Sequence, residues 1–248
     1  MTVSISEGLH LTDRDALRFA RHMLNELDGY SQRARKAITV EVGGKGASLG
    51  NRIGQQRAFG RIAKAMGPTF LNGALGTGKK GKFVFHYSTF SKAEGDLFIL
   101  HVSMHGRQLP KDDAVSAKEL MRFTGHSLQR LIQRAGVREA DDYVPILRAL
   151  AGPSLILAAT AQGSIPYQWP LPVTVNGQRI ILLVKTPIED PVPTAITVYP
   201  GEWRESPVMD VLADRLVTFD PLKFRDGDTD WFRFAFTEAA RSLTERKA

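Results

Sequence analysis

The stretch from Thr124 to Gly136 reads TGHSLQRLIQRAG. His126, Arg130 and Arg134 are spaced at i, i+4 and i+8, so in an α-helix one face carries an imidazole and two guanidinium groups. The opposite face consists of the apolar residues Leu128, Leu131, Ile132 and Ala135. The pattern predicts a helix that buries one face and presents a basic face to an anion such as phosphate. A basic face that is only solvated is the alternative.

The composition indicates a globular protein with a polyanionic partner. The chain has 248 residues, of which 43% are hydrophobic, so it can bury a sizeable core as one large domain or two small ones. Its formal net charge of +7 favours nucleic acid first and an anionic membrane surface second. With no cysteine there is no disulfide framework, thiolate nucleophile or thiolate metal site. We expect neither a metal nor a cofactor.

The chain shows no targeting or membrane signal. The first 24 residues lack the basic segment followed by an apolar segment that a secretory signal requires. The longest apolar runs, such as 154–161, are too short to cross a bilayer. We therefore expect a soluble, cytoplasmic protein of bacterial type that does not bind a membrane.

Hydrophobic periodicity and turn residues predict a mixture of helices and strands. The expected helices span 12–28, 52–65, 116–121, 126–135, 143–150, 210–216 and 231–243. The expected strands span 38–42, 82–90, 96–105, 155–160, 178–185 and 195–199. This order indicates an α+β protein with N-terminal helices, an antiparallel sheet and further helices packed on it. Residues 1–80 form a helical and basic-loop region and residues 81–248 an α+β region, or both form one continuous domain.

Two basic segments are candidates for contact with a nucleic-acid backbone. Arg52, Arg57 and Arg61 lie on the expected helix 52–65, and Lys79, Lys80 and Lys82 lie in a glycine-rich loop over 73–82. Residues 73–79 also fit the start of a phosphate-binding loop, G-x-x-x-x-G-K. Lys80 stands where that motif needs Ser or Thr, so nucleotide hydrolysis is disfavoured.

Histidines gather in the expected hairpin of strands 82–90 and 96–105. An antiparallel turn centred near Ala93 places His86 almost opposite Leu100 and His101, and His105 follows on the same face as His101. His101 is thus a further catalytic candidate. No H-E-x-x-H or comparable spacing accompanies these residues, so a zinc site is the weaker interpretation. The simplest interpretation is that these histidines are ordinary hydrogen-bonded residues of the strands.

A longer pattern follows the basic helix. After His126, Arg130 and Arg134 come the strand-like segments 179–185, RIILLVK, and 196–200, ITVYP. Together, residues 125–203 resemble the catalytic portion of the barnase, EndoU, colicin and RelE superfamily of metal-independent ribonucleases, particularly its small bacterial toxin branches. The insertion around 166–172, the preceding hairpin and the large N-terminal region depart from that pattern. The resemblance implies a toxin-type endoribonuclease that prefers RNA over DNA and has an inhibitor protein as a possible partner.

The chemistry implied by the resemblance assigns a role to each candidate residue. His126 acts as general acid or base, because an imidazole exchanges protons near neutral pH. Arg130 and Arg134 stabilise charge on the phosphate, with Arg130 nearer by its single-turn spacing from His126. Thr197 and Tyr199 alternate onto one strand face, where a hydroxyl holds phosphate or donates a proton, or packs in the sheet.

Two other classes of function compete with the ribonuclease. Residues 117–134 partly match a helix-turn-helix element in which Gly125 is the turn glycine, which favours a non-catalytic nucleic-acid-binding regulator. A structural or assembly protein of a phage or mobile element is the third possibility. The nucleic-acid-binding regulator needs the basic residues but not a catalytic His126. The structural or assembly protein needs neither.

Overall fold

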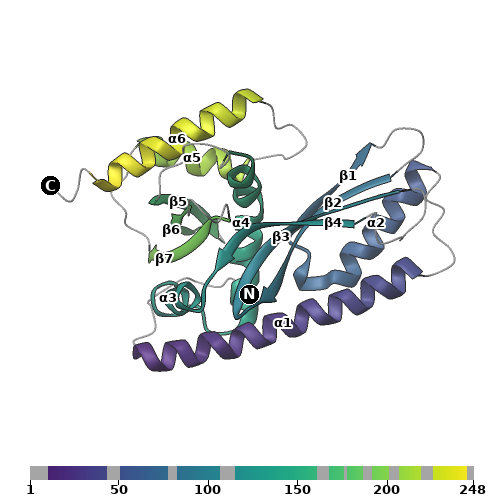
Figure 1. The fold of residues 1–248 in the computed structure, drawn as a ribbon, viewed down its shortest axis with the longest axis horizontal. Coiled ribbons are helices and arrows are strands. Elements are labelled where there is room, and N and C mark those ends of the chain that lie inside the picture. The colour runs from purple at the N-terminus through teal and green to yellow at the C-terminus, as the bar shows by residue number, and fades with distance from the viewer. Residues whose placement is uncertain are drawn as a thin grey trace.

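The computed structural model describes residues 11–43, 51–77, 83–106, 115–160, 168–175, 178–186, 192–200, 207–218 and 226–244. Within these ranges the chain is an α+β fold around one mixed seven-stranded sheet, in the order β1-β2-β3-β4-β7-β6-β5 (Figure 1). The strands are β1 (Asn72–Thr77), β2 (Phe83–Ala93), β3 (Asp96–Gly106), β4 (Val115–Phe123), β5 (Gln168–Val175), β6 (Gln178–Lys185) and β7 (Thr194–Pro200). The helices are α1 (Asp13–Gly43), α2 (Arg52–Met66), a 3-10 turn η1 (Gly67–Thr69), α3 (Gly125–Ala135), α4 (Ala140–Thr160), α5 (Pro207–Val217) and α6 (Asp226–Thr244).

The sheet consists of two antiparallel halves joined by a short parallel seam. Strands β1 to β4 form one half and β5 to β7 the other. At the seam, β4 pairs with β7 only through Arg122 with Thr194 and Phe123 with Ala195. The backbone N–H of Arg122 donates to the carbonyl of Pro193 at 2.9 Å, and its guanidinium pairs with Asp96 at 2.6 Å. Because β1 and β2 pair, the predicted regions 1–80 and 81–248 share this sheet.

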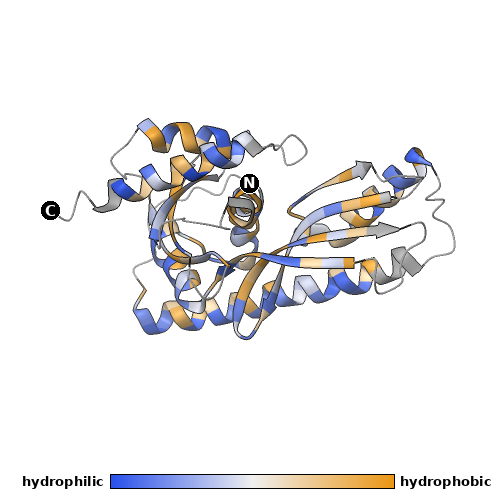
Figure 2. Ribbon diagram, turned by 45° about the horizontal axis from the view of Figure 1, so that its top comes forward, coloured by the Kyte–Doolittle hydropathy of each residue, from blue (hydrophilic) through white to orange (hydrophobic). Residues whose placement is uncertain are grey.

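Helices cover the two halves differently. α1 runs beneath the molecule and, with α2, packs on one face of the β1–β4 half, while α5 and α6 lie over the other half (Figure 1). The contact with α1 and α2 is a cluster of buried residues: Ala34, Ala58, Ile62, Met66, Phe85, Tyr87, Val102 and Met104. A larger core includes buried residues of α3, α4, α6 and β5 to β7. Hydrophobic residues, coloured orange in Figure 2, recur along these helices and strands. α4 lies between the halves and contacts strands of both.

Several predicted elements agree with the structure. The helices over 52–65, 126–135, 210–216 and 231–243 correspond to α2, α3, α5 and α6, and the strands over 178–185 and 195–199 correspond to β6 and β7. The expected hairpin is β2 and β3, joined by Glu94 and Gly95. These two residues have φ of 51° and 86°, the positive values that a two-residue hairpin turn of type I′ requires.

The N-terminal helix is longer than predicted. α1 continues through Gly29 to Gly43, so the expected strand over 38–42 is wrong. The extension is held by tertiary contacts: the Ser31 hydroxyl donates to the carbonyl of Phe90 at 2.9 Å, and Arg35 donates to the Ser91 hydroxyl at 2.7 Å. Such packing outweighs the low helix propensity of glycine and β-branched residues.

Three other segments correct the sequence interpretation. Residues 116–121 lie in β4, so a strand and not a helix directly precedes α3, and the predicted helix-turn-helix element over 117–134 is wrong. Residues 73–77 of the expected glycine-rich loop lie in β1. The expected strand over 155–160 belongs to α4, which continues past Gly152 and Pro153. Its apolar run is buried in the core, where periodicity does not separate helix from strand.

A buried hydrogen bond between α4 and α3 generates a testable prediction. The Tyr143 hydroxyl donates to the carbonyl of Leu128 at 2.9 Å, and the Tyr143 side chain is fully buried. We expect Tyr143→Phe to lower the free energy of unfolding by about 1 kcal/mol in urea denaturation. Tyr30→Phe is the matched control, because the Tyr30 hydroxyl donates to Asp141 at an exposed position. An equal effect of both substitutions contradicts the role of the buried bond.

Candidate functional site

α3 is fixed at both ends and along its apolar face. The Thr124 hydroxyl caps the helix by accepting from the N–H of Ser127 at 3.2 Å, and Gly136 ends it with a left-handed φ of 64°. The apolar residues of the predicted inner face are all at most 2% exposed: Leu128, Leu131, Ile132 and Ala135. The predicted division of this helix into a buried apolar face and a polar face is confirmed.

The first half of the polar face meets the start of α1. Arg130 lies 3.5 Å from the Asp13 carboxylate and donates to the Gln133 side chain at 2.8 Å. Gln133 and Gln129 donate to the same Asp13 oxygen at 3.0 and 3.2 Å. The Gln133 hydrogen bond and the positive charge of Arg130 lower the pKa of Asp13, and His126 contributes in the same direction. His126 itself is exposed.

The second half of the polar face meets β7. Nη1 of Arg134 donates to the Thr197 hydroxyl at 3.2 Å and to the carbonyl of Val198 at 3.3 Å. The guanidinium also lies 5.6 Å from the centre of the Tyr199 ring. The fold thus brings together Arg134, Thr197 and Tyr199, although Arg134 and Thr197 are 63 residues apart in the chain. Val198 points the other way, into the core.

Helical geometry explains why the basic stripe divides. Each residue turns an α-helix by about 100°, so Arg134 lies about 80° around the axis from His126 and about 12 Å along it. His126 and Arg130 therefore face Asp13 on α1, whereas Arg134 faces Thr197 and Tyr199 on β7. We name the surface formed by His126, Arg130, Arg134, Thr197 and Tyr199 the α3–β7 surface.

Sequence reasoning missed Asp13 at this site. The residue lies in the first turn of a helix, where aspartate is common, and nothing in its local pattern points to Arg130 more than a hundred residues later. The same holds for Gln129 and Gln133, whose amides connect α3 to Asp13. A partner of this kind is visible only once α1 is packed against α3.

His101 belongs to a different part of the fold. It lies on β3, where its ring stacks on His86 with centroids 5.5 Å apart, and its recorded neighbours include no residue of α3 or β7. The predicted proximity of His86 and His101 is confirmed, but the register differs. His86 pairs with Ser103, because the hairpin turn is at Glu94 and Gly95 and not at Ala93. The His105 side chain lies outside the described residues.

The residues that the sequence predicts to contact a nucleic-acid backbone lie apart from α3. Arg52 donates to the carbonyls of Gly76 and Leu75 at 3.0 and 3.3 Å, which ties α2 to β1. Arg57 and Arg61 are exposed on α2. Lys79, Lys80 and Lys82 lie outside the described residues. Arg52 therefore has a structural partner, and contact of all these residues with nucleic acid stays a prediction.

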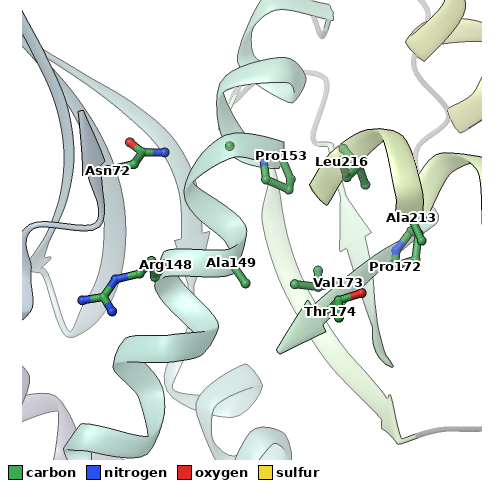
Figure 3. Close-up of a pocket in the computed structure, with 10 residues that line it drawn as sticks. Asn72, Arg148, Ala149, Pro153, Pro172, Val173, Thr174, Ala213 and Leu216 are labelled. Carbon is green, nitrogen blue, oxygen red and sulfur yellow. The ribbon is translucent and has the colours of Figure 1, made fainter. Parts of the chain in front are cut away.

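A hollow of about 230 Å³ opens beside α4 (Figure 3). It is lined by Arg148, Ala149, Gly152 and Pro153 of α4 and by residues of β1, β5 and α5. None of the predicted site residues within the described ranges lines it. Pro153 has no N–H to donate to the carbonyl of Ala149 one turn earlier, so the regular helical bond is missing at this wall.

The described ranges contain no cluster of three or more His, Asp or Glu arranged to hold a metal ion. Among the helices in those ranges, none has the length and apolar character needed to cross a membrane. Comparisons of the chain with protein-family models, with curated proteins and with solved structures each find no match. The resemblance to metal-independent ribonucleases therefore stays a prediction.

The surroundings of His101 generate a prediction about stability. Burial, followed by the charges of His86 and Lys118, lowers the pKa of His101 below its usual 6.5. Since the unfolded chain binds this proton at a higher pH than the folded chain, His101 lowers stability as the pH falls below about 6.5. We expect the free energy of unfolding to decrease from pH 7 to pH 5, measured by urea denaturation, and His101→Gln to flatten that decrease. An unchanged slope in the variant contradicts this assignment.

Proposed function

We propose that the protein is a metal-independent endoribonuclease that acts at the α3–β7 surface. The observation that carries the proposal is the contact of Arg134 with Thr197 and Tyr199 on a helix whose polar face also bears His126 and Arg130. A cation and two hydroxyl-bearing residues from separated segments thus meet at Arg134, and the His126 imidazole lies about two turns away on the same helix. These are the groups that RNA cleavage without metal requires.

The reaction uses the 2′-hydroxyl of RNA as the nucleophile. Its oxygen bonds to the adjacent phosphorus while the bond from phosphorus to the 5′-oxygen breaks, which leaves a 2′,3′-cyclic phosphate and a 5′-hydroxyl. One group accepts the 2′-hydroxyl proton and another protonates the departing 5′-oxygen. We assign His126 to one transfer, and Tyr199 is the candidate for the other. DNA lacks the nucleophile, so RNA is the expected substrate.

Arg134 is the better candidate for the main phosphate ligand. Its recorded bonds to Thr197 and Val198 both start at Nη1, so the guanidinium plane is held in one orientation. A cation held in place stabilises developing charge without reorganising. Arg130 instead lies beside the Asp13 carboxylate, which offsets part of its charge. This ordering differs from the prediction based on single-turn spacing, which placed Arg130 nearer the phosphate.

The test compares cleavage of labelled RNA in EDTA by the wild type and by His126→Ala. We expect the variant to lose about 10²–10⁴-fold in rate and to keep its affinity for RNA. His22→Ala is the matched control, because His22 is an exposed histidine of α1 that pairs with Glu26. If the wild type cleaves no RNA, or if both variants cleave equally, the proposal is wrong. RNA or DNA binding without cleavage instead favours a non-catalytic binder.

A second substitution separates charge from geometry at Arg134. Arg134→Lys keeps the positive charge but loses the planar fork that contacts Thr197, Val198 and phosphate together. We expect the single-turnover rate of cleavage to fall by at least about tenfold, with a smaller change in RNA affinity. Arg138→Lys, at an exposed position just after α3, serves as the control. Equal rates for both lysine variants contradict the role given to Arg134.

A further inference from the structure

The β1–β4 half of the sheet has a polar face that the ribonuclease proposal does not use. Phe85, Tyr87, Val102 and Met104 point toward α1 and α2 on one face. Because side chains alternate along a strand, the residues between them point to the other face. These are His86 and Ser88 on β2, and His101 and Ser103 on β3, which we name the imidazole cluster.

The cluster places one hydroxyl between two imidazoles. The Ser103 hydroxyl lies 2.9 Å from Nδ1 of His86 and 3.3 Å from Nε2 of His101. The two rings are nearly parallel, with an angle of 11° between their planes. Since a hydroxyl has a single proton, one imidazole accepts from Ser103 and the other donates to it. The donor and acceptor roles of the two rings, and hence their tautomers, are therefore linked through Ser103.

Two polar atoms of the cluster have no hydrogen-bond partner within the described part of the chain. They are the Ser88 hydroxyl oxygen and Nδ1 of His101, and both are buried. Ser88 itself is 0% exposed, and it is the direct cross-strand partner of His101. Folded proteins rarely bury such atoms unpaired, and the exceptions call for an explanation such as a bound group or a functional role.

Positive charge flanks the cluster on both sides. Lys118 on β4 is exposed and is the cross-strand partner of His101. On β1, Asn72 is the cross-strand partner of Ser88, and Arg148 reaches from α4 toward these strands beside Asn72 (Figure 3). The charged groups that act on His101 are His86 and Lys118, and no carboxylate in the described ranges is recorded among them.

We propose that the imidazole cluster and Lys118 bind a phosphate-type tetrahedral oxyanion. Such an anion brings negative charge to a face where no carboxylate of the described ranges acts on His101, and its oxygens accept hydrogen bonds from the Lys118 ammonium, a hydroxyl and a protonated imidazole. The Nδ1 of protonated His101 and the Ser88 hydroxyl, which have no hydrogen-bond partner in the described part of the chain, are donors for such an anion. The site contains no residue of the α3–β7 surface, and it goes beyond the proposed ribonuclease.

Binding of the anion takes up a proton. In the free protein, burial and the neighbouring positive charges hold the pKa of His101 below its usual value, so the imidazole is neutral at pH 7. The anion favours the protonated ring, and by linkage protonation favours the anion. Above the pKa of His101, affinity therefore falls by about tenfold per pH unit for each proton taken up. His86, Lys118 and Arg148 are the other groups whose charges shape this dependence.

The experiment follows the histidine side chains of the full chain by NMR while sodium sulfate is added at constant ionic strength. Sulfate keeps its double charge between pH 6 and pH 8, so a change in affinity reports on the protein. The six histidine signals are assigned with His→Gln variants. At pH 6 we expect saturable shifts of His86 and His101, with His22 unchanged. At pH 8 we expect at least tenfold weaker binding.

Charge-matched variants make the site assignment falsifiable. Lys118→Gln is expected to weaken sulfate binding by at least about threefold, whereas Lys64→Gln, at an exposed position on α2, leaves it unchanged. Both positions are exposed, so neither substitution disturbs the core. Absence of saturable shifts, equal shifts of all histidines, or equal effects of the two lysine variants overturns the proposal. None of these readouts depends on RNA cleavage, so failure of the ribonuclease proposal is recognised separately.

Two competitors identify the natural source of the oxyanion once sulfate binding is established. A nucleoside 5′-monophosphate presents a free phosphate monoester, and a thymidine oligonucleotide presents backbone diesters. Displacement of sulfate by the oligonucleotide at concentrations where the monophosphate has no effect identifies a nucleic-acid backbone. Displacement by the monophosphate alone identifies a small phosphorylated ligand.

Discussion

Burial of the apolar face of α3 is the constraint on which the α3–β7 surface depends. Each fully buried Leu or Ile side chain contributes roughly 1.5–3 kcal/mol, and α3 buries Leu128, Leu131 and Ile132 completely or nearly so. The contacts on its polar face are weaker, because an exposed ion pair such as that of Arg130 with Asp13 contributes about 0–1 kcal/mol. Apolar packing therefore fixes the rotation of α3. The polar contacts then select among side-chain rotamers on a helix already in place.

The sheet imposes a second constraint through its short seam. Only two residue pairs join β4 to β7, so the ladder alone does not set how the halves lie relative to each other. α1, with 31 residues, is about 46 Å long and packs against α3 at one end and against α2 and β2 further along. α4 lies between the halves and contacts both. α1 and α4 therefore hold the two halves of the sheet in their relative positions, which in a continuous sheet is the role of a longer ladder of strand pairs.

The elements that can be predicted from the sequence are those whose hydrophobic pattern matches the way they are buried in the fold. α3 has one buried and one polar face, so its periodicity reports its structure directly. β4 is different because residues 115–119 are all exposed, and its alternation carries no apolar signal until Leu120. β5 is not predicted from the sequence, because Pro170 and Pro172 favour a loop. The strand tolerates these prolines because it lies at the edge of the sheet and pairs only with β6. The role of Asp13 cannot be predicted from the sequence, because it depends entirely on the tertiary contact between α1 and α3.

The separation of the two histidine-bearing surfaces follows from the same architecture. Side chains return to the same face every 3.6 residues in a helix and every two residues in a strand. α3 therefore presents His126, Arg130 and Arg134 to two different neighbouring elements. β2 and β3 instead place His86, His101 and two serines on one face of the sheet. The helix surface consequently combines cations with the Asp13 carboxylate, which moderates its field. The strand surface combines two imidazoles with Lys118 and no recorded carboxylate among the described residues, which disfavours protonation of His101. The same residue type thus meets opposite electrostatic environments: His126 lies near the Asp13 carboxylate, whereas His101 lies beside His86 and Lys118.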